Sequence, residues 1–309
     1  MNKEVNLTIN KSNLIIGLAY GYDFDVIKPF IDSLVSISFG QDVVIIGNES
    51  LIIPQEYQGK LNIKVINETS FKRSLVRRAF IKLISANPIN KICNVLFKVS
   101  RKLSPSKFIK LFLNTYHSQV GRYAFYYTYL KQHPYNNILF TDVRDVVFQS
   151  DPFSGFNEKL AVFHESPSIK IKDETFNRNW IKEGFGEDIY KMMANEKIYC
   201  SGTILGNYEG IMTFLEIFIS TCLKYSIPYN IKGMDQGIFN YLIHTNQLKQ
   251  IKKHDNGDRI LTVAPDSFSE IAYKEGKLFF NSKAPAIVHQ YDRYPELIDF
   301  FAQNHNGLF

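Results

Sequence analysis

Cysteine is scarce in this chain, and long apolar runs are missing. The spacing of the three cysteines matches neither a disulfide framework nor a metal-binding motif, which favours a reducing, cytosolic environment. No uncharged apolar stretch approaches the roughly 18 residues that a membrane-spanning helix needs. The first apolar run, residues 14–20, is too short for a signal peptide and is followed shortly by Asp23. We therefore expect a cytoplasmic protein. The cysteines are Cys93, Cys200 and Cys222.

Acidic residues are absent from residues 69–141, a stretch that holds 13 lysines and arginines, although the net charge of the whole chain is only +6. In residues 70–118 the basic residues alternate with Phe, Leu and Ile in helix-length pieces, interrupted by Pro88 and Pro105. Such a pattern is typical of a helical surface that lies peripherally on an anionic membrane. The other interpretation is that the apolar side chains pack on the fold while the basic ones face water. We do not expect nucleic acid as a partner, because the sequence contains no recognisable nucleic-acid-binding motif.

Apolar and aromatic residues, by contrast, are plentiful. Hydrophobic residues make up 45% of the 309 positions, including 25 Phe and 18 Tyr, which predicts a folded globule. Apolar runs at residues 14–20, 42–47 and 62–66 predict strands, and helical periodicity at residues 25–38 predicts a helix after the first of them. A strand–helix–strand order predicts an α/β fold with a doubly wound, largely parallel sheet.

The loop after the first predicted strand is a candidate nucleotide contact. In a parallel α/β sheet, nucleotides bind at the carboxyl ends of the strands. Gly21 ends the first strand, and Tyr20 and Tyr22 on either side offer aromatic faces that could stack on a base. Both tyrosines could equally be ordinary core or surface residues.

The most informative segment is residues 137–153, NILFTDVRDVVFQSDPF. Its apolar run, residues 138–140, predicts a buried strand that leads into Asp142, with Asp145 three residues later and Arg144 between them. Two carboxylates at the end of a buried strand are costly unless a cation meets them. A divalent metal carrying a diphosphate would satisfy both, and Arg144 could take a phosphate charge. The alternative is that the aspartates cap the following turn.

This segment resembles the metal-binding DxD region of GT-A glycosyltransferases, in particular a bacterial and plant group with TD-x-RD-V-x-F-Q-x-DPF. The acids here are spaced D-x-x-D, so which of Asp142 and Asp145 ligates the metal directly stays open. The resemblance covers most of residues 14–295. It implies a single GT-A domain over residues 1–309, with a Rossmann-like, mostly parallel sheet flanked by helices and residues 70–118 as a basic helical insertion.

The resemblance also implies the metal and its ligands. In these enzymes a histidine near the C-terminus commonly completes the metal shell, and His289 ends an apolar run at residues 286–289. Asp142, Asp145 and His289 each end or follow a predicted strand, so we expect them to converge on one Mn²⁺ or Mg²⁺. Two carboxylates and one imidazole suit either ion. A single histidine near the C-terminus, without a neighbouring motif, otherwise usually has a structural role.

Further residues acquire expected roles from the same resemblance. Arg122, on the helix before the metal strand, would point at the nucleotide, and Asp142 and Arg293 would also face the donor. Gly202 lies in a segment similar to the one that passes under the donor sugar, although Cys200 stands where many relatives have Asn. Asp235 with Gln236 resembles an acid–glutamine element on the acceptor side. Arg122 as a solvated arginine and Asp235 as a helix cap are the simpler alternatives.

The implied activity is metal-dependent transfer of a sugar from a nucleotide diphosphate, UDP above all, to a hydroxyl acceptor. The acceptor would be a saccharide or lipid-linked saccharide, as in bacterial surface polysaccharide synthesis. The metal, Arg144, and Arg122 or Arg293 would stabilise the charge on the departing diphosphate. Asp235 is the candidate base if the enzyme inverts the anomeric configuration.

Two other functions compete. One is a non-catalytic protein that binds a membrane surface through its basic stretch. The other is a sugar-1-phosphate nucleotidyltransferase, which would need a glycine-rich N-terminal loop with Arg and Lys around a triphosphate. Residues 17–28 offer only Gly17, Gly21 and Lys28, so this second function is disfavoured.

Overall fold

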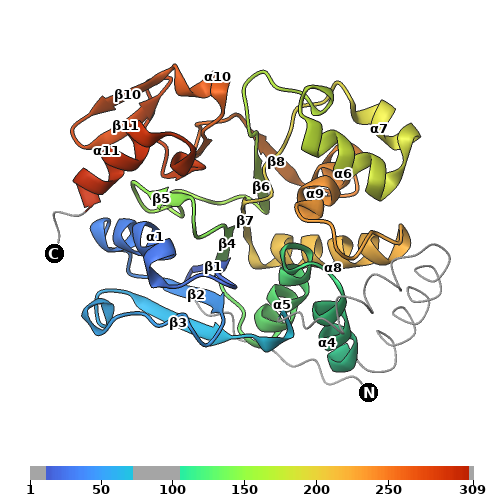
Figure 1. The fold of residues 1–309 in the computed structure, drawn as a ribbon, viewed down its shortest axis with the longest axis horizontal. Helices are drawn as coiled ribbons and strands as arrows, with labels where there is room; N and C mark the ends of the chain where they lie inside the picture. Colours follow the sequence, from blue (N-terminus) through green and yellow to red (C-terminus); the bar gives the residue numbers. More distant parts are fainter. Residues whose placement is uncertain (1–11, 72–104, 306–309) are drawn as a thin grey trace.

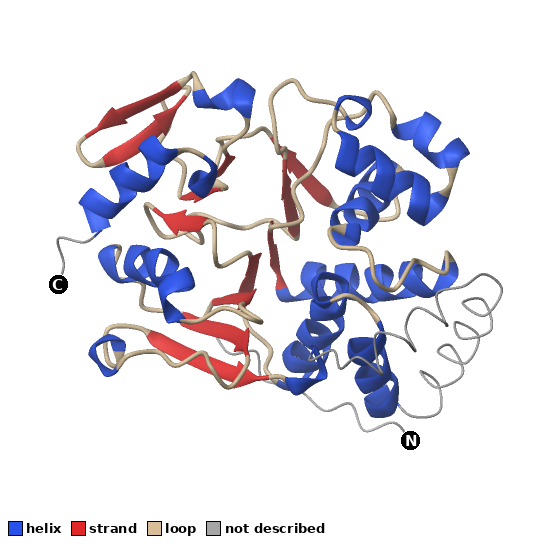
Figure 2. Ribbon diagram, viewed as in Figure 1, coloured by secondary structure: helices blue, strands red, loops and turns tan. Residues whose placement is uncertain are grey.

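The computed structural model describes residues 12–71 and 105–305, and within them the main feature is a seven-stranded sheet (Figures 1 and 2). The strand order is β3-β2-β1-β4-β7-β6-β8. β7 runs antiparallel to both of its neighbours, and the other pairs are parallel. The chain is therefore an α/β protein with a mostly parallel central sheet, as predicted. The strands are β1 (Leu14–Leu18), β2 (Asp42–Gly47), β3 (Asn62–Asn67), β4 (Asn137–Thr141), β6 (Leu160–Phe163), β7 (Thr203–Asn207) and β8 (Ile251–His254).

Helices cover both faces of this sheet, which explains why its inner strands are largely apolar. Ile15 of β1 packs in one core cluster with Phe30 of α1. Its neighbour Ile16 points to the opposite face and packs with Tyr123 of α5 and Phe214 of α8. The helices are α1 (Phe24–Ser36), α4 (Pro105–Thr115), α5 (Ser118–Gln132), α6 (Thr175–Phe185), α7 (Glu187–Met193), α8 (Tyr208–Lys224), α9 (Met234–His244), α10 (Pro265–Phe268) and α11 (Pro295–His305).

Two smaller sheets lie beside the central one (Figure 2). The first contains β5 (Val146–Phe148), β12 (Ile287–His289) and β9 (Ile260–Thr262), and the second is the hairpin β10 (Ile271–Lys274) and β11 (Lys277–Phe280). The apolar run at residues 286–289 thus forms a strand, as predicted, but this strand belongs to a separate sheet.

Element boundaries differ from the predictions where turns interrupt apolar runs. β1 ends at Leu18, and Gly21 adopts a left-handed backbone with φ of 86° in the turn that follows. A turn also precedes β7, which begins at Thr203. That turn is what brings Gly202 into the site.

The predicted basic insertion, residues 70–118, can be examined only in part, because residues 72–104 lie outside the described residues. Residues 105–115 form α4, in which Phe108 and Phe112 are buried in the core and Lys110 is exposed. In α4, Phe108 and Phe112 therefore pack on the fold, whereas Leu111 is 42% exposed. Among the described helices, none is both long and apolar enough to cross a membrane.

Candidate metal and donor-binding site

The two aspartates and the histidine of the predicted metal site come from β4, β5 and β12. Asp142 follows the last residue of β4, and its backbone N–H donates to the carbonyl of Gly202 at 2.8 Å. Asp145 immediately precedes β5. Because β12 pairs antiparallel with β5, placing His289 opposite Val146, the histidine lies next to Asp145. The pairing of β12 with β5 therefore brings His289 next to Asp145, although the two residues are far apart in the sequence.

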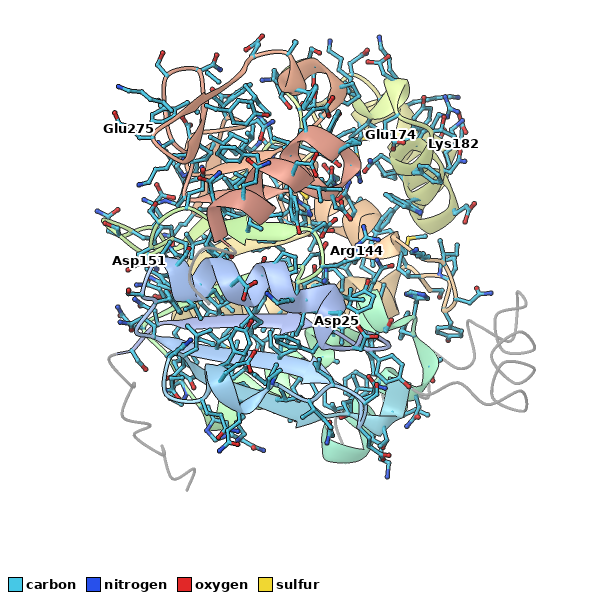
Figure 3. All side chains as sticks on the ribbon, turned by 60° about the vertical axis from the view of Figure 1, so that its left-hand side comes forward. Asp25, Arg144, Asp151, Glu174, Lys182 and Glu275 are labelled. Carbon is cyan, nitrogen blue, oxygen red and sulfur yellow. The ribbon has the colours of Figure 1, made fainter. Side chains whose placement is uncertain are left out.

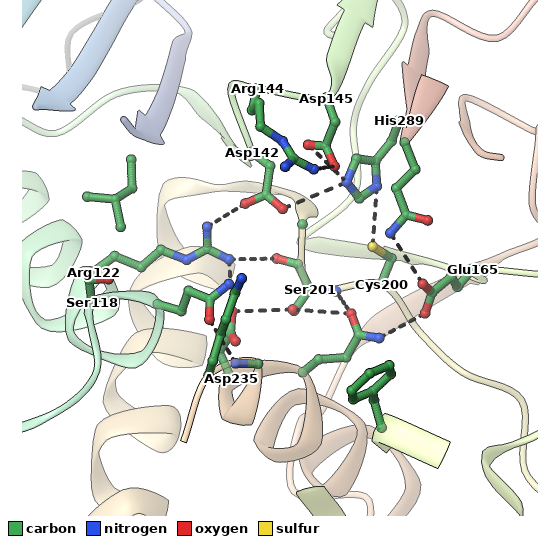
Figure 4. Close-up of a pocket in the computed structure, with 18 of the residues that line it drawn as sticks. Ser118, Arg122, Asp142, Arg144, Asp145, Glu165, Cys200, Ser201, Asp235 and His289 are labelled. Atoms are coloured by element: carbon green, nitrogen blue, oxygen red, sulfur yellow. Dashed lines mark hydrogen bonds and ion pairs between the residues drawn. The ribbon is translucent and has the colours of Figure 1, made fainter. Parts of the chain in front are cut away.

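These three side chains form a cluster that could bind a metal ion. One ligand atom from each of Asp142, Asp145 and His289 lies within 4.8 Å of the other two. Nε2 of His289 is 3.7 Å from Oδ2 of Asp142 and 3.8 Å from Oδ1 of Asp145 (Figure 4). The expected convergence of these residues is thus observed, and two carboxylates with one imidazole are a donor set that can hold a divalent metal ion.

The nitrogen of His289 that faces the two acids is well placed to bind a metal. Nε2 is buried and has no hydrogen-bond partner among the described residues, an arrangement that is uncommon for a buried polar atom. On the other side of the ring, Nδ1 lies 3.4 Å from both the Cys200 sulfur and the Thr262 hydroxyl. A hydrogen bond from Nδ1–H would leave the Nε2 lone pair free for a cation. The sequence contained no signal for Thr262, and the contact of Cys200 was not predicted.

Gly202 lies in close contact with two of the candidate metal ligands. A Cβ at this position would be 2.6 Å from Cε1 of His289 and 2.7 Å from Oδ2 of Asp142, closer than real side-chain carbons approach such atoms. The backbone of Gly202 therefore lies directly against two of the three candidate ligands. The structure thus places Gly202 beside the candidate metal ligands, and its contact with a donor sugar stays a prediction.

We expect Gly202→Ala to remove metal binding without changing any ligand residue. The added methyl group must displace His289 or Asp142, so the affinity for Mn²⁺ should fall at least tenfold in isothermal titration calorimetry. Gly40→Ala is the matched control, because nothing lies within 4 Å of a Cβ there and its φ is not left-handed. Equal Mn²⁺ affinity of Gly202→Ala and wild type would contradict this account of the site.

The electrostatics of the cluster favour a cation. Burial alone would raise the pKa of Asp142, but Arg122 and His289 hold it below its ordinary value. Burial and the negative charge of Asp142 raise the pKa of Asp145, against the opposing effect of His289. Burial would lower the pKa of His289, yet Cys200 and the two carboxylates raise it well above its ordinary value. The acids that attract a proton to His289 would also attract a metal ion, which would replace that proton.

Arg122 lies between two carboxylates. One guanidinium nitrogen is 2.6 Å from Oδ1 of Asp142, and the other is 2.9 Å from Oδ2 of Asp235 (Figure 4). The second nitrogen also donates to the carbonyl of Ser201 at 3.4 Å. Arg122 is 5% exposed, so it is not the solvated arginine of the simpler alternative. Asp235 is the second residue of α9 and is 3% exposed, and its carboxylate pairs with Arg122 instead of only capping the helix.

The remaining predicted donor contacts line the same pocket, which has a volume of about 600 Å³. Arg144 is half-exposed and its guanidinium lies 3.5 Å from Asp145 and 3.2 Å from Asp292. Figure 3 shows Arg144 near the centre of the molecule, above the start of α1. Tyr20 and Tyr22, in the loop after β1, and Arg293, in the short helix η4 (Tyr291–Arg293), also line the pocket. All the predicted site residues therefore border one cavity.

Glu165 is a pocket residue that the sequence did not single out. It follows β6, and its carboxylate accepts hydrogen bonds from Nε2 of Gln236 at 2.8 Å and Nε2 of Gln290 at 3.4 Å. Burial raises its pKa, against the effects of His289 and Arg293. In Figure 4 Glu165 and Arg122 lie on opposite sides of the pocket, with Ser201 and Cys200 between them. No local sequence pattern marks Glu165, because its partners come from distant parts of the chain.

Comparison with models of known protein families and with curated proteins gives no match for this chain. The assignment of function therefore depends on the geometry and chemistry of the pocket.

Proposed function

We propose that this protein is a metal-dependent glycosyltransferase of the GT-A type, which transfers a sugar from a UDP-sugar to a hydroxyl of a saccharide or lipid-linked saccharide. The observation that carries the proposal is the Asp142–Asp145–His289 cluster at the end of β4, inside a pocket of about 600 Å³. A pocket of this volume accommodates a small organic ligand. The mostly parallel sheet, with the cluster outside the carboxyl end of β4, supports the same function.

In this proposal Asp142, Asp145 and His289 hold Mn²⁺ or Mg²⁺, which neutralises the diphosphate when bound. Arg144 is half-exposed at the pocket and is available to a phosphate oxygen. Arg122 would influence the diphosphate without contacting it, because both of its terminal nitrogens already bind carboxylates. It fixes the orientation of Asp142 and adds positive charge close to the place where the departing diphosphate becomes more negative.

The proposal predicts that UDP binding requires the metal. UDP with Mn²⁺ should raise the melting temperature of the wild-type protein, whereas UDP in EDTA should not, because ligand binding stabilises only the folded state. Release of free sugar from a panel of UDP-sugars, measured by chromatography with and without Mn²⁺, then tests for turnover. Release of pyrophosphate from a nucleoside triphosphate and a sugar 1-phosphate would instead indicate the nucleotidyltransferase. Absence of any nucleotide binding would leave the non-catalytic function.

The role of Asp235 as base has a separate test. If Asp235 accepts the proton of the attacking hydroxyl, Asp235→Asn should lower the transfer rate about 10²–10⁴-fold while UDP affinity stays nearly unchanged. Burial raises the pKa of Asp235 and Arg122 opposes this, so the carboxylate needs Arg122 to stay ionised. Asparagine keeps the shape of the side chain and one carbonyl oxygen for Arg122. A mild rate effect, or an NMR spectrum showing retention of the anomeric configuration, would remove Asp235 as the base.

A further inference from the structure

An aromatic pair on α6 faces the pocket on the side of Glu165. Phe176 and Trp180, one helical turn apart, have ring centroids 5.9 Å apart and planes inclined by 30°, so the rings are stacked. Both line the pocket, yet Phe176 is 66% exposed. An exposed phenyl ring is not unusual by itself. An exposed ring that is stacked on a second aromatic ring inside a polar cavity is a better indication of a ligand-binding surface.

Local contacts hold the indole of Trp180 and the backbone of the first turn of α6 in place. Gly233 adopts a left-handed backbone with φ of 81°, and a Cβ there would lie 2.0 Å from Cζ2 of Trp180, so the indole packs directly on this backbone. The side chain of Glu174 accepts hydrogen bonds from the backbone N–H groups of Phe176 at 3.1 Å and of Asn177 at 2.6 Å, which fixes the first turn of α6. Figure 3 shows Glu174 and Lys182 on the outer side of the molecule where α6 lies. A preorganised surface binds a ligand without a cost for ordering it.

A row of polar side chains connects this aromatic pair with Glu165. Gln236 donates from Nε2 to Oδ1 of Asn177 at 3.3 Å and to Oε2 of Glu165 at 2.8 Å. Asn177 follows Phe176 in α6 and lines the same pocket as the two rings. The pocket therefore offers a flat aromatic face next to amide and carboxylate groups. A pyranose has matching features, namely an apolar face of C–H groups and a rim of hydroxyls.

We infer that Phe176 and Trp180 form an acceptor subsite in which a pyranose ring stacks on Phe176 while one of its hydroxyls donates a hydrogen bond to Glu165. This inference rests on the proposed function for the identity of the reaction, but the saccharide binding can be measured without it. The C–H groups of the sugar face the electron-rich ring, as the edges of other rings do in aromatic pairs. The acceptor is thus a saccharide whose terminal ring presents an apolar face. The carboxylate of Glu165 lies at the end of this subsite, across the pocket from Arg122 (Figure 4).

Trp180 is the single tryptophan of the chain, so its fluorescence reports directly on the subsite. We expect a saturable change in emission when wild-type protein is titrated, without nucleotide, with a panel of methyl glycosides and disaccharides of glucose, galactose, mannose and N-acetylglucosamine. Phe176→Ala should weaken the binding of the responding sugar about tenfold, because it removes the stacking surface. Phe176→Tyr, which keeps the ring, should bind as wild type does. Glu165→Gln should weaken the same sugar less than Phe176→Ala.

The control variant is Met192→Ala in α7, which removes an exposed apolar side chain, 69% accessible, that does not line the pocket. It should match wild type in every titration. The inference is overturned if no sugar of the panel changes the emission, or if Phe176→Ala binds sugar as tightly as wild type. It is also overturned if Phe176→Ala mainly weakens UDP, which would assign the ring to the nucleobase. Sugar binding without any metal-dependent UDP binding would instead refute the proposed function and leave the saccharide subsite standing.

Discussion

Asp145→Ala is expected to abolish metal-dependent turnover, with a loss of at least about a thousandfold, while the protein stays folded. The side chain is one of three clustered candidate ligands, so its removal should weaken the binding of the ion on which the proposed reaction depends. Metal-free stability should not fall, because burial and the charge of Asp142 already make the ionised carboxylate of Asp145 unfavourable. We therefore expect an unchanged or slightly higher melting temperature in EDTA.

Thermal-shift measurements with and without Mn²⁺ and UDP detect the loss of ligand binding separately from the loss of catalysis. At one hundred times its dissociation constant, a ligand stabilises the folded state by about 2.7 kcal/mol, and this gain should disappear in Asp145→Ala. Asp299→Ala is the matched control, because this exposed aspartate lies in α11 and does not line the pocket. The metal assignment would be wrong if Asp145→Ala turned over UDP-sugar at the wild-type rate in EDTA-treated buffer.

Arg122→Met is expected to lower the free energy of unfolding by about 3–5 kcal/mol at neutral pH. Its guanidinium pairs with Asp142 and Asp235, and the carboxylate of Asp235 is 4% exposed, so removal of the cation leaves a buried negative charge without compensation. Adding Asp235→Asn to the same chain should restore a large part of the loss, because the uncompensated charge is then gone. Urea denaturation followed by circular dichroism gives the free energies of unfolding of the single and the double variant.

Arg144→Met is the control for this experiment. Arg144 also pairs with two carboxylates, but it is 50% exposed, so its removal should cost no more than about 1 kcal/mol of stability. Both variants should weaken UDP binding in the presence of Mn²⁺ by about tenfold in calorimetry, since each removes positive charge beside the proposed diphosphate site. A stable Arg122→Met protein with unchanged UDP affinity would contradict the role assigned to Arg122.

The sequence by itself indicated the α/β class, several strands of the central sheet and the first helix, and the pair of carboxylates Asp142 and Asp145, whereas His289 was proposed from the family resemblance. The run at residues 42–47 became a strand at those bounds, because a strand buried on both faces needs apolar side chains at most of its positions. The segment around Asp142 and Asp145 was informative for a similar reason. Carboxylates at the end of a buried strand have an energetic cost that a cation offsets. Such rules act on neighbouring residues, so they can be deduced from the chain.

Only the tertiary structure decided which distant residues meet. The pairing of β12 with β5 placed His289 beside Asp145, and the packing of α5 against α9 placed Arg122 between Asp142 and Asp235. The sequence had suggested a phosphate contact for Arg122 and could not show that two carboxylates already occupy it. Glu165 likewise gained its place from contacts with residues more than 70 positions away. Side-chain contacts of this kind depend on strand register and helix packing, which follow from the whole core and not from any local pattern.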